Sequence, residues 1–456
     1  SDAYDVASEI TVINAETLEV SSIRLLNGAT CMANMCVSPD GKYLYVVGVL
    51  ARYQFPGGQV SRIWISTNAL SIIDVERREL VTMILLDNVY VGAADPYDVV
   101  VSEDGSELYV SHAGSQELMV INAAAMHEKI AALPKDKEEL TARLEAAGWP
   151  DYDSSTSYSS ATLEDIPNDL AFLEGLGQLI RLPGKGPRGL GVFGDDVFIA
   201  IYFSDSIVRM NGIASLDKNL NESYDLYIDD WWGDKELIET KVPLNFRVWP
   251  DSNMIALGET PVLAEARRGE MLFQDATICY ENWYSCATCH PDGRVDGLNY
   301  DLYDDGCGNP KNVSSMVMAH ESEPSGWRGV RQSFDTSVAA KVRHVLWSIR
   351  SQEDLDAIMA YIRSLEPAPS PHYRYDEDGR PLRSVAAGRA LFESEEVGCA
   401  TCHPAPIYTD NQSHDVGSRS LYDRVDEFYT PSLVECWRTG PYLHDGRYLS
   451  IRELLI

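Results

Sequence analysis

Hydrophobic and polar residues alternate along most of the first 260 residues with the period of two that is typical of β-strands. The stretch "VINAETLEV" is followed by "VSPDGKYLYVVG", "IIDVERRELV" by "VVVSEDGSELYVSHA", and "MVINAAA", after an interruption, by "LGVFGDDVFIAIYF". Each unit joins an alternating strand to a strand rich in Val, Tyr and Ile through a turn rich in Asp and Gly. A weaker fourth copy runs from "IVRMN" to "FRVWPDSNMIALGE". A repeat of roughly 40–50 residues predicts a β-propeller over residues 1–260, because a single blade cannot bury both of its faces alone.

The third unit is interrupted by an insertion at about residues 123–180. The segment "PKDKEELTARLEAAG" has the charge spacing of a helix, "ATLEDIPNDLAFLEGLGQLI" is expected to form a second helix, and the polar "DYDSSTSYSS" between them is expected to be a loop. The insertion is either a surface decoration or a docking lid. The wording of the repeats resembles the YVTN family of surface-layer and periplasmic propellers, although four legible blades are fewer than the usual seven.

From residue 262 onward the hydrophobic period changes to that of helices. "AEARRGEMLF", "TSVAAKVRHVLWSI" and "SQEDLDAIMAYIRSL" are predicted helices, and the last begins with a capping box of Ser351 and Asp354. After a Pro-rich linker at residues 368–384, "SVAAGRALF" repeats the phrase "AEARRGEMLF". We therefore predict two related α-helical, cytochrome c-like domains, at residues 262–367 and 385–456. Ser450 and Glu453 form a capping box without a following C-cap, so the second domain is expected to be incomplete at its C-terminal end.

Each helical domain carries the pentapeptide Cys-Ala-Thr-Cys-His a short way after its Gly-x-x-Leu-Phe phrase. In Cys-x-x-Cys-His, the two thiols can add to the vinyl groups of haem, and the adjacent His faces the iron as its fifth ligand. The alternatives are half of a zinc site or a redox dithiol. A zinc ribbon needs two Cys pairs close together, whereas these pairs lie in separate domains. We assign one covalent c-type haem to Cys286, Cys289 and His290, and a second one to Cys399, Cys402 and His403.

Charge and cysteine content narrow the partners and the location. With 37 Lys and Arg against 70 Asp and Glu, the net charge of −33 disfavours nucleic acid and anionic membranes and favours cations and basic proteins. No apolar run approaches the ~20 residues of a membrane span, and the N-terminus does not resemble a signal peptide. Covalent haem attachment of this type happens outside the bacterial cytoplasm, so we expect a periplasmic or cell-surface protein in which disulfides persist. The expected disulfides are Cys31–Cys36 and Cys279–Cys307, and Cys436 is expected to be a buried free thiol.

Residues 262–456 resemble the bacterial di-haem cytochrome c peroxidase/MauG superfamily. The resemblance rests on both C-A-T-C-H motifs, on "GNPKNVSSM" and "SGWRGVR" after the first, and on "TPSLVECWRTGPYLHDGR" after the second. It implies that the first haem is the low-potential active site, that the second relays electrons, and that Trp327 lies between them. It also implies a calcium ion at the domain interface, held by the side chain of Asn312 and the backbone of Thr439 and Pro441, and oxygen ligands suit Ca²⁺. Core packing is the plainer interpretation of Trp327.

The chain departs from the peroxidase pattern around both haems. The loop "PDGRVDGLNYDLYDDGCGNP" lacks the His that peroxidases place there, and the distal Glu that cleaves peroxide has no counterpart. The corresponding region offers His344, with three interpretations: a distal acid/base above an open haem, an iron ligand that creates a bis-His electron carrier, or a structural histidine. No Met follows His403, so the sixth ligand of the second haem is open, and the candidates within the chain are His414, Tyr442 and His444.

These expectations support two main classes of function. The leading hypothesis is a di-haem oxidoreductase in which the first haem reacts with hydrogen peroxide or oxidises a protein substrate, with His344 and Trp327 as catalytic residues. The propeller would then dock a redox partner, such as a basic cytochrome, or anchor the chain in a larger assembly. The alternative is a non-enzymatic electron-transfer subunit with two six-coordinate haems. A redox sensor built on a ligand-binding propeller is a third hypothesis.

Overall fold

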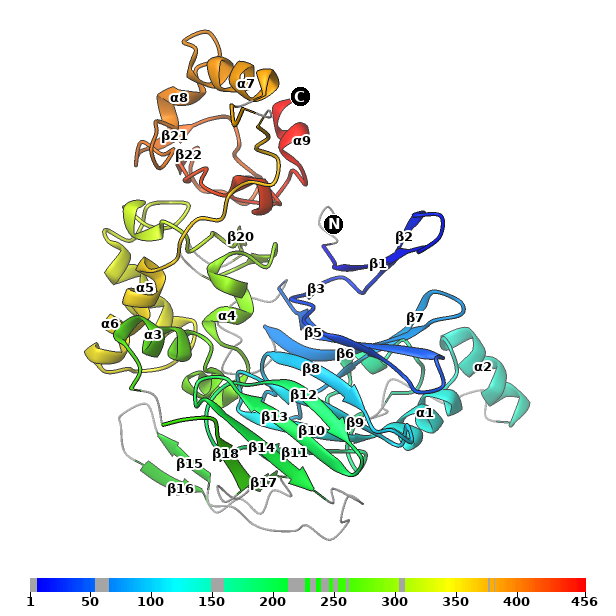
Figure 1. Ribbon diagram of the computed structural model, residues 1–456. Coiled ribbons are helices and arrows are strands. Elements are labelled where there is room, and N and C mark those ends of the chain that lie inside the picture. Colours follow the sequence, from blue (N-terminus) through cyan, green and yellow to red (C-terminus); the bar gives the residue numbers. More distant parts are fainter. Residues whose placement is uncertain are drawn as a thin grey trace.

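The computed structural model describes residues 6–53, 65–148, 160–211, 253–259, 262–302, 308–375, 378–380 and 382–456, together with the backbone of three short strands between residues 226 and 248. Sheets build the N-terminal region, and short helices with their connections build the C-terminal region (Figure 1). The multidomain organisation predicted from the sequence is therefore confirmed. Among the described residues, no helix is long and apolar enough to cross a membrane.

Three sheets form the main body of the N-terminal region, and all their strands are antiparallel except for one strand added to the second sheet (Figure 1). The first contains β3 (Ala29–Thr30), β4 (Met35–Val37), β5 (Tyr43–Ala51), β6 (Ser66–Asp74) and β7 (Glu79–Leu85). The second contains β8 (Pro96–Val101), β9 (Glu107–His112), β10 (Glu117–Asn122) and β11 (Gly177–Arg181), and the third contains β12 (Pro187–Phe193), β13 (Asp196–Ile201), β14 (Ser206–Asn211) and β18 (Met254–Ala256). Strand β8 of the second sheet contacts both β4 of the first sheet and β12 of the third, so the three sheets are neighbours, as adjacent propeller blades are.

The same turn connects β4 to β5 and β8 to β9. The Ser38 hydroxyl donates to the carboxylate of Asp40 at 2.7 Å, and the Ser102 hydroxyl donates to Asp104 at 2.7 Å. The glycine after each Asp has a positive φ, of 73° in the first turn and 77° in the second, which glycine adopts at little cost. The phrases "SPDG" and "SEDG" therefore specify the same hairpin connection in two sheets.

The first and fourth sequence repeats fold differently from the prediction. The phrase "VINAETLEV" lies in a separate hairpin of β1 (Glu9–Ile13) and β2 (Val20–Arg24). In the fourth copy, β14 pairs with β13 across a tight turn, β18 pairs with β14, and β17 (Phe246–Val248) joins the second sheet parallel to β11, so the described strands of this copy do not form one blade-like sheet. A further hairpin consists of β15 (Leu226–Asp229) and β16 (Lys235–Ile238). The described chain thus holds three blade-like sheets where the sequence predicted four, and a closed propeller stays a prediction.

The insertion contains the first predicted helix but not the second. Helix α1 (Ala123–Ala132) begins after Asn122, and α2 (Lys137–Ala146) begins after Asp136, whose side chain accepts a hydrogen bond from the Glu139 N–H at 2.9 Å. The prediction of a helix at residues 161–180 is wrong: a 3-10 turn at Ile166–Asn168 and strand β11 occupy this segment. The carboxylates of Asp165 and Asp169 accept hydrogen bonds from the backbone N–H groups of residues 160–162. Such local hydrogen bonds compete with those of a helix. The predicted polar loop falls almost wholly outside the described residues.

The first helical part is organised around two crossing helices, α3 (Glu265–Phe273) and α6 (Gln352–Arg363). They approach so closely at Gly269 that an added Cβ would lie 1.8 Å from the carbonyl oxygen of Ala357. Helix α6 begins after Ser351, whose side chain accepts from the Asp354 N–H at 3.2 Å. Between the two helices the chain forms α4 (Cys286–Cys289), β19 (Asn299–Tyr300), β20 (Lys311–Asn312) and α5 (Phe334–His344).

The second helical part is smaller and lies beyond the first, away from the sheets (Figure 1). It consists of α7 (Arg383–Glu393), α8 (Cys399–Cys402), β21 (Ser413–Asp415), β22 (Glu427–Tyr429) and α9 (Ile451–Leu455). The capping box predicted for Ser450 and Glu453 is present at the start of α9. The domain limits drawn from the sequence stay predictions.

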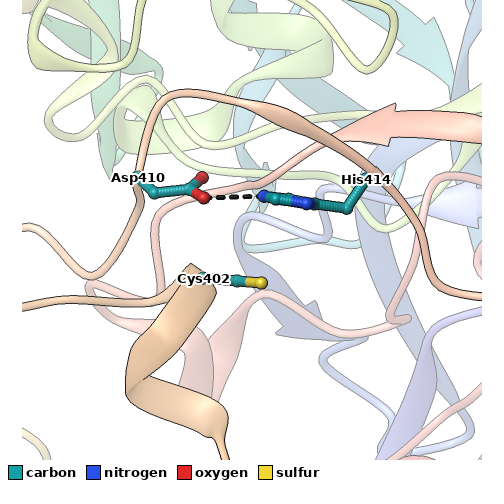
Figure 2. A group of neighbouring side chains, drawn as sticks. All are labelled: Cys402, Asp410 and His414. Atoms are coloured by element: carbon teal, nitrogen blue, oxygen red, sulfur yellow. Dashed lines mark hydrogen bonds and ion pairs between the residues drawn. The ribbon is translucent and has the colours of Figure 1, made fainter.

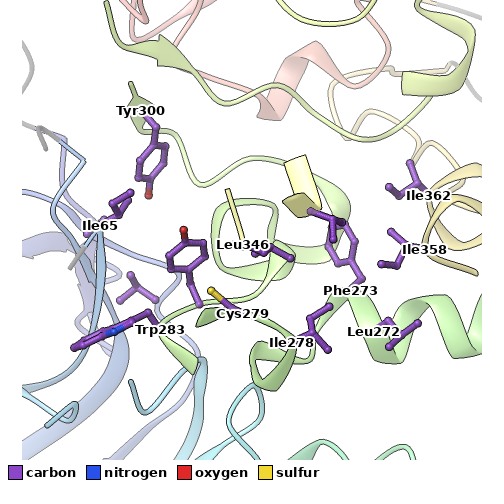
Figure 3. Packing of buried hydrophobic residues seen from close by; sticks show 14 of the residues in the cluster. Ile65, Leu272, Phe273, Ile278, Cys279, Trp283, Tyr300, Leu346, Ile358 and Ile362 are labelled. Atoms are coloured by element: carbon purple, nitrogen blue, oxygen red, sulfur yellow. The ribbon is translucent and has the colours of Figure 1, made fainter. Parts of the chain in front are cut away.

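One hydrophobic cluster joins the sheet region to the first helical part (Figure 3). Ile65, which leads into β6, belongs to the same cluster as Phe273 of α3 and Ile358 of α6. Trp283, in the segment before α4, is only 1% exposed within it. A single contiguous core therefore fixes the first helical part on the sheets.

Candidate haem-attachment sites

The first C-A-T-C-H motif forms a single helical turn, α4, which is capped from two directions. Ser285 and Thr288 form a capping box, in which the Ser285 hydroxyl accepts from the Ala287 N–H at 3.1 Å and the Thr288 hydroxyl accepts from the Ser285 N–H at 2.9 Å. Both hydroxyls then donate to the carboxylate of Asp95, which leads into β8, at 2.7 Å from Ser285 and 2.5 Å from Thr288. Asp95 therefore fixes the start of the turn from the sheet region.

The groups that would attach a haem are arranged at this turn. Cys286 and Cys289 lie three residues apart, so they share one side of the turn, and both are free thiols. The Nδ1 atom of His290 lies 3.0 Å from the carbonyl oxygen of Arg294. A histidine held in this way presents Nε2 to a metal, and burial, which lowers the pKa of His290 to about 4, keeps the ring in the neutral form that ligates. The donor set fits a covalent c-type haem.

The first turn packs against a cluster of apolar and aromatic side chains, part of which is drawn in Figure 3. Tyr284 is 2% exposed, and its hydroxyl donates to the carbonyl oxygen of Val345 at 2.6 Å. Tyr300 and Leu346 belong to the same cluster, and Cys286 and Cys289 pack against it. Such a shell restricts solvent access and suits a porphyrin.

The disulfide predicted between Cys31 and Cys36 is wrong, because both are free thiols. Cys31 follows β3, and its Sγ donates to the carbonyl oxygen of Thr288 in α4 at 3.3 Å, whereas Cys36 lies on β4 opposite Tyr45. The two cysteines are close in sequence but serve different contacts. The predicted partner of Cys279, Cys307, lies outside the described residues. Cys436 is a free thiol, as predicted, but it is half-buried rather than buried.

The second C-A-T-C-H motif repeats the geometry with looser cover. Helix α8 follows Gly398, which has a φ of 74°, and the Nδ1 atom of His403 lies 2.8 Å from the carbonyl oxygen of Tyr408. Cys399 and Cys402 are free thiols. Leu391 of α7 and Val397 nearby in the chain are 60% and 52% exposed. Free thiols and uncovered apolar side chains in one segment offer a surface on which a porphyrin can pack, so this turn also fits a haem.

Cys402 has a second set of neighbours, Asp410 and His414 (Figure 2). His414 Nε2 lies 2.7 Å from Asp410 Oδ2, and one ligand atom from each of the three residues lies within 4.8 Å of the others. These are zinc-type donors, but a thioether bond at Cys402 would remove its thiolate, so the metal and the haem are alternatives at this cysteine.

The predicted sixth ligands of the second haem are engaged by the protein. His414 Nε2 is bound by Asp410, His444 Nε2 lies 2.7 Å from Asp423, and the Tyr442 hydroxyl donates to the carbonyl oxygen of Cys436 at 2.6 Å.

An internal repeat brings Trp327 and His444 together between the two helical parts. The bridge between Ser325 and Arg331 recurs, at the same spacing, as the bridge between Tyr442 and Tyr448. Trp327 and His444 occupy matching places within these two loops. Their ring centroids are 6.3 Å apart in an edge-to-face arrangement.

Backbone hydrogen bonds across this contact are reciprocal. The Asn312 N–H donates to the carbonyl oxygen of His444 at 2.8 Å, and the Tyr429 N–H donates to the carbonyl oxygen of Trp327 at 2.9 Å. This exchange is what a two-fold relation between the two helical parts produces. The Trp327 indole donates to the carbonyl oxygen of Asn312 at 2.7 Å, which fixes the ring at the contact.

Asn312 and Pro441, two of the residues predicted to bind calcium, meet at the same interface. The Asn312 side-chain amide donates to the carbonyl oxygen of Pro441 at 2.5 Å, and its Oδ1 atom is buried without a hydrogen-bond partner. Asn299, which pairs with Asn312 across β19 and β20, also has a buried Oδ1 without a partner. Unpaired oxygens beside loop carbonyls fit a hard cation. Thr439 lies two residues before Pro441, and its role as a ligand stays a prediction.

His344, predicted as a catalytic residue, ends helix α5 and is exposed. The next residue, Val345, accepts the hydrogen bond from Tyr284 in the shell of the first turn. The role of His344 stays a prediction.

Comparison with known proteins finds homologues for less than half of the chain. No protein-family model matches. Hydrazine synthase subunit gamma of Kuenenia stuttgartiensis is 30% identical over 233 residues, which are 40% of this chain and 65% of that protein. The methylamine utilization protein MauG is 24% identical over 45% of this chain and 75% of its own length in Methylophilus methylotrophus, and 23% identical over 41% and 66% in Methylorubrum extorquens. The chain thus spans just under two thirds of the length of the gamma subunit.

Solved structures give weaker overlays. A hydrazine synthase structure from Kuenenia stuttgartiensis, determined under xenon, has a TM-score of 0.37 at 27% identity, covering 42% of this chain and 78% of that one. A MauG-like protein associated with microbial copper homeostasis has a TM-score of 0.34 at 17% identity, covering 44% and 76%. A periplasmic gluconolactonase of Pseudomonas aeruginosa has a TM-score of 0.27 at 13% identity, covering 57% and 52%. TM-scores of this size do not establish a common fold.

Sequence reasoning missed the residues that hold the attachment turns in place. Asp95 lies in the sheet region, far from the motif in sequence, and Arg294 and Glu435 bind one another across the two helical parts. A usable signal existed only for Arg294, because it lies in the loop directly after the C-A-T-C-H motif.

Proposed function

We propose that this chain is a di-haem c-type oxidoreductase of the peroxidase/MauG kind that works outside the cytoplasm. Its homologues MauG and hydrazine synthase subunit gamma support this proposal. The observation that carries it is the repeated turn. In both copies, two free thiols lie on one helical turn, and a backbone carbonyl binds the Nδ1 atom of the histidine that follows.

The residues of the chain have distinct tasks in this proposal. Haem bound at these turns supplies one-electron redox chemistry. His290 and His403 would be the axial ligands, each oriented through its Nδ1 atom. Trp327, fixed by the Asn312 carbonyl at the centre of the repeat, is our candidate for electron transfer between the two parts. A calcium ion held by Asn312, Thr439 and Pro441 would stabilise this contact.

Partners follow from charge and from the relatives. The net charge of −33 favours a basic redox protein, such as a basic cytochrome, as the electron-transfer partner. The relative from Kuenenia stuttgartiensis is named as a subunit, so we propose that this chain also works in an assembly, with the sheet region as a docking surface. The proposed substrate at the first turn is either hydrogen peroxide, which would be reduced, or a protein, which would be oxidised. His344 would be the acid/base residue.

The mass of the denatured protein tests the covalent attachment. We expect the intact mass to exceed the polypeptide mass by two porphyrins, and we expect the double variant Cys399→Ser, Cys402→Ser to lose one of them. Cys31→Ser is the matched control, because this thiol touches α4 but lies outside both motifs, and it should keep both porphyrins. A wild-type chain without porphyrin mass would refute the proposal, and zinc bound at Cys402 would then be measured by metal analysis.

Spectroscopy separates an enzyme from an electron-transfer subunit. A high-spin, five-coordinate signal at one haem in the electron paramagnetic resonance spectrum supports an oxidoreductase with an open site. Two low-spin haems in every redox state identify an electron-transfer subunit instead. Trp327→Phe should slow electron exchange between the two haems, and an unchanged rate would remove Trp327 from the path.

A further inference from the structure

The loop after the first attachment turn is bound by a side chain of the second helical part. Arg294 accepts the hydrogen bond of His290 through its carbonyl oxygen, at 3.0 Å from Nδ1. Its guanidinium group binds Glu435 through two parallel hydrogen bonds, from Nε and from Nη2, each of 3.0 Å. One residue therefore links the proximal histidine of the first turn to the second helical part. Paired bonds of this kind are the most directional contacts that arginine makes.

Glu435 is built to hold this arginine. Its side chain is fully buried, with 0% exposed, while that of Arg294 is 18% exposed. The carboxylate also accepts from Arg438, with Nη2 at 2.8 Å, and from the N–H of Ala368 in the linker. Burial alone would raise the pKa of Glu435, but these hydrogen bonds outweigh it and lower the pKa, so the carboxylate stays ionised. Three separate segments meet on one buried charge.

The second attachment turn shows the contrast. His403 binds the carbonyl oxygen of Tyr408, and the Tyr408 ring contacts Phe392 of α7, which belongs to the same helical part. The equivalent carbonyl at the second turn is thus held locally. The ionic link between the two helical parts serves the first turn.

We propose that Glu435 is a positioning residue for His290: by holding Arg294 it fixes the carbonyl that orients the imidazole, so the second helical part sets the axial-ligand geometry of the first. This inference rests on the proposed function, because it takes His290 as a haem ligand. Hydrogen-bond partners beyond the ligand fix ring orientation and raise ligand basicity, which is the effect assigned here to Arg294.

The expected consequence is a change in the first haem with little change in the second. Glu435→Gln keeps the shape of the side chain but removes its charge, so its hydrogen bonds with the Arg294 guanidinium group weaken. A less basic His290 stabilises oxidised iron less well, and loss of a buried negative charge acts in the same direction. We therefore expect the midpoint potential of the first haem to rise in Glu435→Gln.

The experiment is a redox titration of the two-haem protein, followed optically and by electron paramagnetic resonance. The double variant Cys286→Ser, Cys289→Ser identifies the signal of the first haem by its loss. Arg294→Lys keeps the carbonyl but lacks the paired donors, so it should shift the first haem as Glu435→Gln does. Arg438→Lys disturbs the Glu435 carboxylate from within the second helical part and should shift the midpoint potential of the first haem less than Arg294→Lys does. Glu427→Gln, an exposed carboxylate on β22, is the matched charge control and should shift neither haem.

Amide hydrogen exchange gives a readout that does not depend on the haem signals. The Gly293 N–H donates to the carbonyl oxygen of His290 at 2.9 Å, and the Arg294 N–H donates to that of Pro291 at 2.9 Å. Both amides should exchange faster in Glu435→Gln and in Arg294→Lys, and at the wild-type rate in Glu427→Gln.

Two results would overturn the inference. A folded Glu435→Gln protein in which only the potential of the second haem moves would make Glu435 a local charge of the second part. Unchanged potential and unchanged exchange at residues 290–294 in both Glu435→Gln and Arg294→Lys would show that the carbonyl is held without this link. Failure of the proposed function is a different observation, since it appears as missing porphyrin mass in the wild-type protein.

Discussion

Replacing Gly269 with Ala tests the closest approach between two helices of the first helical part. A Cβ at this position of α3 would lie 1.8 Å from the carbonyl oxygen and 2.5 Å from the carbonyl carbon of Ala357, and 2.9 Å from Cβ of Tyr361. Two of these atoms belong to the backbone of α6, so no side-chain rotation relieves the overlap. The two helices must separate to accept a methyl group.

The size of the effect follows from two opposing terms. Alanine is more favourable than glycine inside a helix by about 1 kcal/mol. Overpacking a tight contact costs about 1–3 kcal/mol, and we take the upper end, about 3 kcal/mol, because the neighbouring atoms belong to the backbone and cannot rotate away. We therefore expect Gly269→Ala to lower the free energy of unfolding of the first helical part by about 2 kcal/mol.

The repeat within the chain supplies the matched control. Gly388 is the corresponding glycine of α7, in the phrase "GRALF" that answers "GEMLF". An added Cβ there meets no atom within 4 Å. Only the helix-propensity term remains, so Gly388→Ala should stabilise α7 by up to about 1 kcal/mol.

Native-state hydrogen exchange measures both variants in the intact protein. Peptides from α6 (Gln352–Arg363) report on Gly269→Ala, and peptides from α7 (Arg383–Glu393) report on Gly388→Ala. Opposite signs are expected at the two sites. If Gly269→Ala stabilises α6 as Gly388→Ala stabilises α7, the close contact between α3 and α6 does not exist and the reasoning fails.

Three further predictions concern buried charges and the ion site. Burial raises the pKa of Glu117 to about 7 from an ordinary value of 4.5, so the contribution of Glu117 to stability is present below pH 4.5 and is lost as the pH rises through 7. Glu117→Gln should therefore raise the free energy of unfolding by up to about 3 kcal/mol at pH 8 and change it little at pH 4. Equal effects at both pH values would refute this pKa shift. Asp95→Ala leaves the buried hydroxyls of Ser285 and Thr288 without their acceptor, which should lower the free energy of unfolding by about 1–3 kcal/mol. Because the first turn is then held less firmly, peptide mass spectrometry should show less porphyrin on Cys286 and Cys289 and unchanged porphyrin on Cys399 and Cys402. Removal of calcium by a chelator should lower the melting temperature of the wild-type protein but not that of Asn312→Ala, and an equal drop in both would place calcium elsewhere.

Local sequence patterns predicted the parts of the fold that local physics decides. The Asp-Gly turns of the sheets, the N-cap of α6 and the capping box at Ser450 all depend on residues a few positions apart. The two C-A-T-C-H motifs were legible for the same reason, since each motif occupies one helical turn.

Predictions that required a choice of distant partner did less well. The fourth repeat had the composition of a blade, but β14 and β18 found their partners in the third sheet. The segment at residues 161–180 had helical periodicity, but the carboxylate of Asp165 accepts hydrogen bonds from the N–H groups of Ala161 and Thr162 at its start. Periodicity shows that a face is buried; it does not show which neighbour buries it.

The same limit explains what was missed at the candidate sites, and it leads to a functional consequence. The two attachment turns share the sequence C-A-T-C-H, yet Asp95 of the sheet region holds the start of the first turn and Glu435 of the second helical part holds its end through Arg294. The second turn is held by Tyr408 within its own part. The geometry of a turn that is hydrogen-bonded to two neighbouring regions depends on both of them, whereas the geometry of a turn held within its own part does not. If the haem proposed for the first turn responds to a docked partner or to the second helical part, the contacts place that response at Cys286, Cys289 and His290.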